Sequence, residues 1–500
     1  MVSVLVLAAV FLLFLAAFLL FRALLYSSSE EPVEAPAPID VDSLTVAGHL
    51  ARIVRCQTVS GMDPDRTDWE EFRGLRHELA SMYPRVHRTL AVTPVSHASL
   101  LFTWQGSDPE LKPVLLAAHQ DVVPVEAEMQ TAWDFPPFSG EIAEGYVWGR
   151  GSMDDKSAII GLMEAAEALI QGGFHPERTI YFALGHDEEL AGVDGAGAIA
   201  RLLMEEGVEL EAVIDEGGFL VTGLIPGVDR PLAMVGVAEK AFLNLELTAE
   251  GPGGHSSAPV VPTAIGRLSR AIERLESHPM PARLKYAAWL MDAIASELPI
   301  GERILFANRW LFGPLLKSRF SEDPTLNAMI RTTTAPTLVQ GGVKENILPA
   351  EARAVVNFRL LPGDTLQSVI QHATRVLNDE KVRLRVQGLS GRAGGEEMPA
   401  EALQKMDAVS DTRGPVYPLL ADSIRKVFPE AVVAPYLSYG ASDARYYLPV
   451  CPQVFRFAPI RFDPGDFSRV HGTNERLAVK NCGDMVLFYR SLMTTLAGKG

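Results

Sequence analysis

The sequence predicts an α/β fold in which a mostly parallel sheet is covered by helices, and two observations support this prediction. Short runs of consecutive apolar residues occur at 114–118, 179–184 and 212–214. Continuous apolar runs of this length are typical of strands that are buried on both faces of a parallel sheet. Between the first two runs, residues 156–170 repeat apolar side chains at helical spacing. A strand, a helix and a second strand in this order indicate a parallel sheet with helices on its faces.

Other elements precede and follow this sheet. Two helical patterns, at 42–57 and 68–83, come before the first predicted strand. Near Val237 the apolar pattern changes from continuous to alternating, which indicates a half-exposed antiparallel sheet. Two alternating segments and two helical segments then follow, at 242–251, 352–363, 263–275 and 365–377.

We therefore predict a larger domain made of residues 43–237 and 388–500, with a smaller α+β domain inserted at 238–387. A chain of 500 residues with 48% hydrophobic and 21% charged content fits two folded domains. The net charge is −17 and the chain contains no basic run. Nucleic acid is therefore excluded as an expected partner, because phosphate contacts need clustered Lys and Arg side chains.

The N-terminal residues 1–25 carry a membrane-type segment. Every residue from Val4 to Phe21 is apolar, which is long enough to span a hydrocarbon core of about 30 Å. The run is also longer than the apolar core of an ordinary cleaved signal peptide. We expect a membrane anchor, with a cleaved signal as the alternative, and hence a membrane-anchored or secreted, extracytoplasmic protein. Residues 26–42, rich in Ser, Glu and Pro, are expected to form an extended linker.

Histidines and carboxylates follow the predicted strands at the points where each strand ends. The candidates are His119 and Asp121, Asp154 and Asp155, Glu188 and Glu189, Asp215 and Glu216, and His471 in a later loop. Ligands of open α/β sheets bind at the carboxyl ends of the strands. Taken singly, each candidate is also explained as a helix cap, an acidic first turn, a core histidine or a surface loop.

The joint occurrence of these residues favours a metal site. Carboxylates gathered at neighbouring strand ends repel one another strongly unless cations neutralise them. Two histidines with several carboxylates form a ligand set that suits zinc, with manganese or cobalt as substitutes.

Seven sequence motifs resemble, in order and spacing, the co-catalytic metallopeptidase family of aminoacylase, carboxypeptidase S, glutamate carboxypeptidase and acetylornithine deacetylase. The motifs are HQDVVPV, WGRGSMDDK, GHDEE, VIDEGG, GPGGHSSAP, GVKENILP and RVHGTNE. The resemblance begins near Ser43 and covers nearly all of the chain after it. RTTTAPT and RWLFGPLL are most similar to the branch that contains carboxypeptidase S and the secreted N-fatty-acyl-amino-acid synthase/hydrolase.

The resemblance implies two zinc ions in the larger, catalytic domain. It implies that His119 and Asp215 bind one ion, that Glu189 and His471 bind the other, and that Asp154 bridges them. In such sites a further carboxylate orients a ligand histidine, and the resemblance gives this role to Asp121. It also implies a cis peptide between Asp154 and Asp155.

The resemblance implies that Glu188 is the general base, which takes a proton from water and hands it to the leaving amine. The inserted domain would act as a lid, and its His255 would stabilise the oxyanion. Asn346 and Arg359 would bind the carboxylate of the substrate, although an exposed strand residue is an equally simple interpretation of Arg359. A homodimer through the lid domain is a further expectation.

The expected function is a dizinc hydrolase of N-acyl amino acids, N-fatty-acyl amino acids above all, or of small peptides with a free carboxylate. Condensation of a fatty acid with an amino acid is the reverse reaction. The alternatives are a carboxypeptidase S-like dipeptidase and a catalytically silent metal-binding scaffold. A serine hydrolase is disfavoured because the segment Gly440 to Ala444 lacks the last glycine of the nucleophile elbow.

Apolar and aromatic residues are dense between Tyr286 and Leu316, inside the predicted insertion. Packing or a dimer contact explains them in the simplest way. A groove for an acyl chain is the alternative that the resemblance favours.

Overall fold

The computed structural model describes residues 2–26, 41–387, 408–463 and 465–498. Its largest sheet has ten strands, and nine of them follow the order β1-β2-β6-β3-β7-β17-β9-β8-β18, while β16 pairs with β9. Their bounds are β1 (Ala91–Val95), β2 (Ser99–Trp104), β3 (Val114–His119), β6 (Ile180–Gly185), β7 (Ala212–Asp215), β8 (Phe219–Val221), β9 (Leu232–Glu239), β16 (Val432–Ser438), β17 (Val454–Arg456) and β18 (Arg461–Phe462). The mixed α/β class predicted from the sequence is confirmed.

The three continuous apolar runs form β3, β6 and β7, which are neighbours in this sheet. Both β6 and β7 pair with β3 in parallel. Leu116 of β3 faces one hydrophobic core and Leu115 faces a second core on the other side of the sheet. Because both faces are buried, these strands have no polar alternation.

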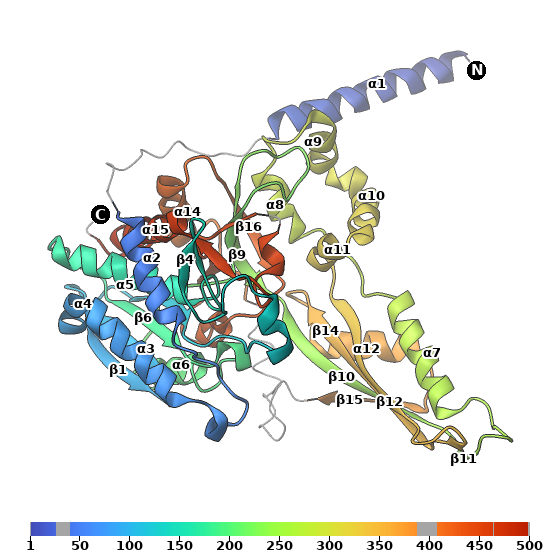
Figure 1. Ribbon diagram of the computed structural model, residues 1–500. Coiled ribbons are helices and arrows are strands. Elements are labelled where there is room, and N and C mark those ends of the chain that lie inside the picture. Colours follow the sequence, from blue (N-terminus) through green and yellow to red (C-terminus); the bar gives the residue numbers. More distant parts are fainter. Residues whose placement is uncertain (1, 27–40, 388–407, 464, 499–500) are drawn as a thin grey trace.

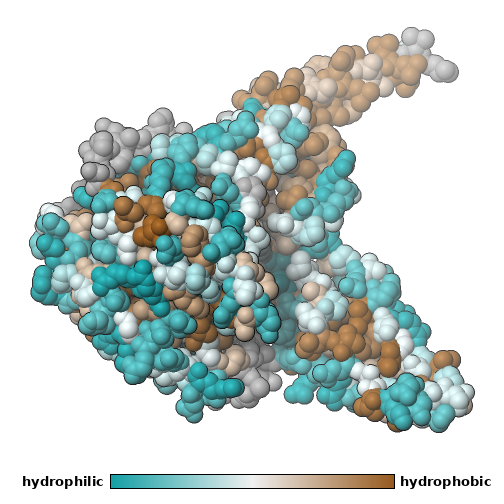
Figure 2. Space-filling view, viewed as in Figure 1, coloured by the Kyte–Doolittle hydropathy of each residue, from teal (hydrophilic) through white to brown (hydrophobic). Residues whose placement is uncertain are grey.

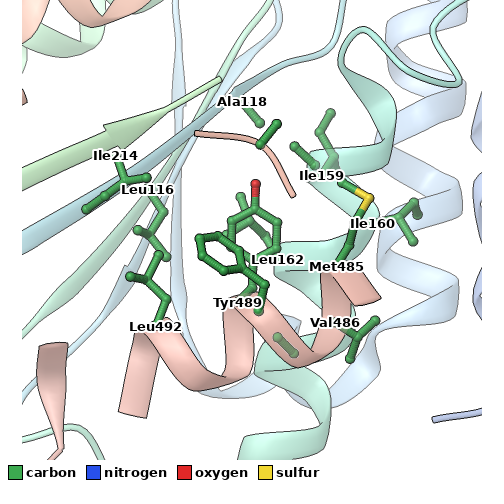
Figure 3. Close-up of a cluster of buried hydrophobic side chains, with 14 of the residues drawn as sticks. Leu116, Ala118, Ile159, Ile160, Leu162, Ile214, Met485, Val486, Tyr489 and Leu492 are labelled. Atoms are coloured by element: carbon green, nitrogen blue, oxygen red, sulfur yellow. The ribbon is translucent and has the colours of Figure 1, made fainter. Parts of the chain in front are cut away.

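Helices cover both faces of the large sheet (Figure 1). One core contains residues of α2 (Ser43–Val54), α3 (Trp69–Met82), α4 (Pro84–Thr89), α5 (Lys156–Gln171), α14 (Val416–Val427) and α15 (Val479–Ala497), and the other contains residues of α6 (Ala196–Glu205). Figure 3 shows Tyr489 and Met485 of α15 packed among Leu116 of β3 and Ile159 and Leu162 of α5. A small sheet of β4 (Glu141–Ala143), β5 (Tyr146–Trp148) and β19 (Arg476–Ala478) lies beside this domain.

A second, four-stranded sheet has the order β12-β14-β10-β15 and is antiparallel throughout. Its strands are β10 (Ala241–Glu250), β12 (Thr333–Gly341), β14 (Glu351–Leu360) and β15 (Val382–Gln387). The helices α7 (Ala264–Ser277) and α12 (Leu366–Leu377) cover one face and share a separate core with it. At the far end, β11 (Gly254–His255) pairs with β13 (Ile347–Leu348). We call this unit the lid; Figure 1 shows it extending away from the large sheet.

Four helices inside the predicted insertion lie outside the core of the lid. They are α8 (Ala287–Ala293), α9 (Ile300–Ala307), α10 (Arg309–Glu322) and α11 (Pro324–Ile330). Leu290 and Met291 of α8 and Ile330 of α11 share a hydrophobic core with β8, β9 and β16 of the large sheet. Much of the apolar density that begins at Tyr286 therefore serves packing against the large sheet.

The N-terminal helix α1 (Val2–Leu25) projects from the body and contacts α9 (Figure 1). Within the described residues, it is the one helix long and apolar enough to cross a membrane. Figure 2 shows its exposed surface as apolar along most of its length. The predicted linker at 26–42 lies almost entirely outside the described residues.

Candidate metal centre and pocket

The ends of β3, β6 and β7 bring the predicted site residues to one edge of the large sheet. His119 is the last residue of β3, and its register partner Gly185 is the last residue of β6. Asp215 is the last residue of β7. Glu188 and Glu189 begin a short 3-10 turn just after β6. Parallel pairing is what brings these residues together, because parallel strands end at the same edge.

Asp154 lies between two histidines. Its Oδ1 is 2.9 Å from His119 Nε2, and its Oδ2 is 3.1 Å from His471 Nε2. His471 Nε2 is also 3.1 Å from Glu189 Oε1. His119, Asp154 and Glu189 each offer one potential ligand atom, and these atoms lie within 4.8 Å of one another. This spacing lets the carboxylate of Asp154 serve two cations, one on each side.

Asp215 adds a buried carboxylate to the group. The residue is 3% exposed and its Oδ2 has no hydrogen-bond partner among the described residues. Burial raises the pKa of Asp215 above its usual value. A buried oxygen without a partner is costly, and a divalent cation at this oxygen would remove the cost. The donor set of two histidines and three carboxylates therefore fits a pair of divalent metal ions.

Asp121 holds both the histidine and the two glutamates. Its carboxylate accepts hydrogen bonds from the backbone amides of Glu188 and Glu189, at 3.1 and 3.2 Å. His119 Nδ1 lies 3.0 Å from the carbonyl oxygen of Asp121 and 3.4 Å from its carboxylate. These contacts fix the imidazole so that Nε2 points toward Asp154.

A buried ion pair joins the two loops that carry Asp154 and His471. Glu475 accepts hydrogen bonds from the amides of Met153 and Asp154, at 2.9 and 3.2 Å. Arg150 donates to the other oxygen of Glu475 at 2.6 Å and to the carbonyl of Gly472 at 2.9 Å. Glu475 ends the RVHGTNE motif, but its role was not predicted, because the pairing with Arg150 joins residues far apart in the chain. The Asp154–Asp155 peptide is cis.

A pocket of about 480 Å³ opens beside this group of residues. Asp154, Glu188, Glu216 and His471 line its polar part. Burial raises the pKa of Glu188 well above its usual value, and the nearby carboxylates of Asp443 and Glu189 act in the same direction. A pocket carboxyl group with a raised pKa is a candidate for taking up and releasing a proton during a reaction.

Three phenylalanines form an apolar wall of the same pocket, and we call them the aromatic wall. The ring centroids of Phe219 and Phe462 are 5.0 Å apart, and those of Phe462 and Phe467 are 5.1 Å apart. Phe219 belongs to β8 and Phe462 to β18, which pair in the sheet although they are far apart in the chain. Spacing along the chain could not reveal this wall, because pairing between distant strands creates it.

The three lid residues predicted for the site lie elsewhere in this structure. His255 is exposed on β11, and Asn346 is exposed just before β13. Arg359 is half-buried on β14, where its guanidinium lies 5.3 Å from the ring centroid of Phe242. None of the three is among the residues that line the pocket. The structure therefore brings together the predicted metal ligands but not these lid residues.

The segment Gly440 to Ala444 does not form a nucleophile site. Ser442 is 2% exposed, and its hydroxyl lies 3.3 Å from Glu239 Oε2 and 3.2 Å from Arg456 Nε. The hydroxyl therefore belongs to the buried ion pair of Glu239 and Arg456, whose charges lie 2.8 Å apart, and this contact is structural.

The chain belongs to peptidase family M20/M25/M40, whose model matches residues 115–495. It is 37% identical over 485 residues to probable carboxypeptidase S-like 2 of Dictyostelium discoideum, covering 95% of this chain and 91% of that protein. It is 39% identical over 402 residues to human N-fatty-acyl-amino acid synthase/hydrolase PM20D1, covering 80% and 77%. The family resemblance drawn from the motifs is confirmed, and with it the assignment as a metallopeptidase-type hydrolase.

Solved structures agree on the fold. The M20 family metallo-carboxypeptidase Sso-CP2 of Sulfolobus solfataricus has a TM-score of 0.60 at 18% identity, with 91% of this chain and 99% of that chain covered. The YXEP protein of Bacillus subtilis, described as a dinuclear metal-binding peptidase, has a TM-score of 0.54 at 12% identity, with 91% and 99% covered. In this chain the candidate metal centre is the group of His119, Asp154 and Glu189, which rests on their geometry alone.

Proposed function

We propose that this protein is a dizinc hydrolase of N-acyl amino acids, with long acyl chains preferred over peptides. The observation that supports this best is the two-sided pocket, which has the metal-type residues at one part and the aromatic wall at another. A substrate with an amide bond next to a long apolar chain matches both parts. Hydrolysis and the reverse condensation would share the same site.

In this proposal His119 and Asp215 would hold one zinc ion, Glu189 and His471 would hold the other, and Asp154 would serve both. Bound there, the ions would polarise the amide carbonyl and lower the pKa of the attacking water. Asp121 keeps His119 oriented, and Glu475 keeps the Asp154 and His471 loops together. Manganese or cobalt ions suit the same donors.

Glu188 moves the proton. Its carboxylate lines the pocket and binds no other described side chain by an ion pair. It would take a proton from the attacking water and deliver it to the amine that leaves. The neighbouring Glu189 is already oriented toward His471, at 3.1 Å, so the two adjacent glutamates take different roles.

The lid residues complete the proposal. His255 would stabilise the oxyanion, and Asn346 and Arg359 would bind the carboxylate of the amino acid. This requires either closure of the lid or a second copy of the chain. The edge strand β12 exposes Leu338 and Val339, and we propose it as the contact of a homodimer.

We also propose that α1 is retained as a membrane anchor. The resemblance to carboxypeptidase S-like proteins and to the secreted synthase/hydrolase does not decide between a retained anchor and a cleaved signal. Polar contacts join the last turns of α1 to the folded body, and this packing supports retention.

The substrate proposal is tested with the purified protein on one amino acid carrying acyl chains from acetyl to palmitoyl, beside dipeptides, with bound metal measured. We expect kcat/KM to rise with acyl length, since each buried methylene contributes about 0.8 kcal/mol, or roughly fourfold. Phe462→Ala should flatten this series for long chains and leave the acetyl substrate nearly unchanged. A flat series with faster dipeptide cleavage would instead identify a carboxypeptidase S-like enzyme. Turnover that survives complete metal removal would rule out the metal-dependent mechanism.

A further inference from the structure

The last turns of α1 are packed against the folded body. Leu15, Leu19 and Tyr26 are partly buried, and Ala23 is fully buried, whereas the other side chains described in this helix are exposed. Their spacing of four, four and three residues places them on one face of the helix. The amide of Asn308, between α9 and α10, donates to the carbonyl of Leu19 at 3.1 Å.

An ionic contact fixes the end of the helix. Arg309 of α10 donates to the hydroxyl of Tyr26 at 2.8 Å and to Asp292 of α8 at 2.7 Å. Tyr26 also donates to Asp292. The helix is therefore attached to α8, α9 and α10 over its C-terminal part, and it cannot move away from them without breaking these contacts.

This attachment limits how far α1 can reach into a bilayer alone. The part of α1 before Leu15 contains about 13 residues, which at 1.5 Å per residue is roughly 20 Å long. A hydrocarbon core is about 30 Å thick. If α1 spans the bilayer, about 10 Å of the core must be crossed by the part that is packed against α9. The surface of α9 and its neighbour α10 must then enter the outer part of the bilayer, from the headgroups to the upper acyl chains.

The surface of these helices has the composition that such a position requires. Ile300 of α9 and Trp310, Leu311 and Leu315 of α10 are 47%, 59%, 40% and 46% exposed. Ile300 begins α9, and the other three lie in the first two turns of α10, whose first residue, Arg309, contacts Tyr26. The last turn of α10 is charged and carries the exposed pair Arg319–Glu322. Apart from Glu302 of α9, the exposed residues of these helices are apolar or small near the anchor and charged farther along. This order matches the depth profile of a membrane interface.

An open groove of about 480 Å³ adds two cations to this surface. Its lining includes Lys285, Trp310, Pro314 and Lys317. Neither lysine forms an ion pair with a described carboxylate. Lysine side chains at such a position extend their ammonium groups to the phosphates of lipid headgroups while their stems lie against apolar atoms. With a net charge of −17 on the chain, apolar burial and not overall charge must hold this surface to a membrane.

We infer that α9 and the first two turns of α10 form a membrane-docking surface that inserts into the phospholipid interface beside α1. Trp310, Leu311 and Leu315 lie at the level of the upper acyl chains, and Lys285 and Lys317 face the headgroup phosphates. The inference rests on the proposed retention of α1. The docking surface is connected to the catalytic pocket through packed elements. Helix α8 packs against β16, and Tyr436 of β16 lines the pocket. The pocket is therefore held at a fixed position relative to the membrane. Amphiphilic acyl substrates concentrate in the same interface.

The test uses the full-length protein in phosphatidylcholine nanodiscs, with an environment-sensitive fluorophore on single introduced cysteines in a Cys56→Ala background. Cys451 and Cys482 are buried. The Cys56→Ala protein without an introduced cysteine is labelled in parallel, and its fluorescence measures how much fluorophore these two residues bind. Leu315→Cys reports the proposed surface and Leu12→Cys reports α1. Met204→Cys is the control, because Met204 is a similarly exposed apolar residue, at 51%, on α6.

We expect a lipid-borne nitroxide to quench the labels at Leu315 and Leu12 at least about threefold more than the label at Met204, with iodide in the water showing the opposite order. If the Leu12 label lies in lipid and the Leu315 label behaves like that at Met204, the docking surface is wrong while the anchor holds. If the Leu12 label is in water, both the anchor and the docking surface are wrong. Turnover of a water-soluble acetyl substrate by each labelled variant shows that it is folded.

Discussion

Glu188 and Glu189 show how two identical neighbours acquire different surroundings. Both backbone amides donate to Asp121, which fixes the turn in which they lie. The carboxylate of Glu189 contacts His471, and the carboxylate of Glu188 lines the pocket. The difference comes from the direction of the turn and not from the residue type.

At this scale we predict that Glu188→Gln keeps bound metal and substrate affinity but lowers kcat by at least about 10²-fold, because the amide cannot accept a proton. The measurements are kcat, KM and metal content per chain. Glu189→Gln is the matched comparison, since the same substitution one residue away should lower metal content. Equal metal loss in both variants would contradict the assignment of Glu188, and full activity of Glu188→Gln would contradict the mechanism.

At the scale of the helices, a close contact supports the floor of the site. Gly161 of α5 faces Tyr489 of α15, and a Cβ added at Gly161 would lie 2.8 Å from Cδ2 of that ring. Tyr489 packs beside Leu116 of β3 (Figure 3). Only a residue without a side chain lets α5 and α15 approach each other this closely beneath the strands that carry His119 and Asp215.

We predict that Gly161→Ala lowers the free energy of unfolding by about 1–2 kcal/mol, because overpacking costs about 1–3 kcal/mol and the gain in helix propensity returns up to about 1 kcal/mol. Gly48→Ala in α2 is the matched control, since a Cβ there meets nothing within 4 Å. It should raise stability by up to about 1 kcal/mol. Urea unfolding measures both; a Gly161→Ala variant as stable as Gly48→Ala would disprove the contact.

For the whole molecule, the junction between the large sheet and the lid is held by buried charges. Glu239, at the end of β9, pairs with Arg456 at 2.8 Å. The next residue, Lys240, donates to the carbonyls of Ala328 and Arg331 at 3.1 and 3.0 Å before β10 begins. These bonds attach the lid firmly at its base, while its far end, which carries His255, extends into solvent (Figure 1).

We predict that the protein is a dimer through β12 and that Val339→Lys shifts it toward monomer in sedimentation velocity. Val339 is 64% exposed on an edge strand, and a lysine on such an edge opposes pairing with another strand. Met204→Lys makes the same kind of change on α6 and should leave the sedimentation coefficient unchanged. A wild-type protein that sediments as a monomer at every concentration would refute the dimer.

Some features follow from local pattern alone. The continuous apolar runs identify β3, β6 and β7, because strands buried on both faces need apolar side chains at every position. The same runs locate His119, Glu188, Glu189 and Asp215, since each lies at the end of a strand or just after it. The motifs around them identify the family, which the comparisons confirm. The roles assigned to Glu188 and to the metal ligands remain predictions.

Only the tertiary structure decides the features that depend on contacts between distant parts of the chain. The aromatic wall exists because β8 and β18 pair, and Glu475 supports Asp154 because two loops meet. The apolar helix α8 lies within the insertion in sequence but packs against the large sheet. Periodicity along a chain shows which face of an element is buried, but it cannot show which partner buries it.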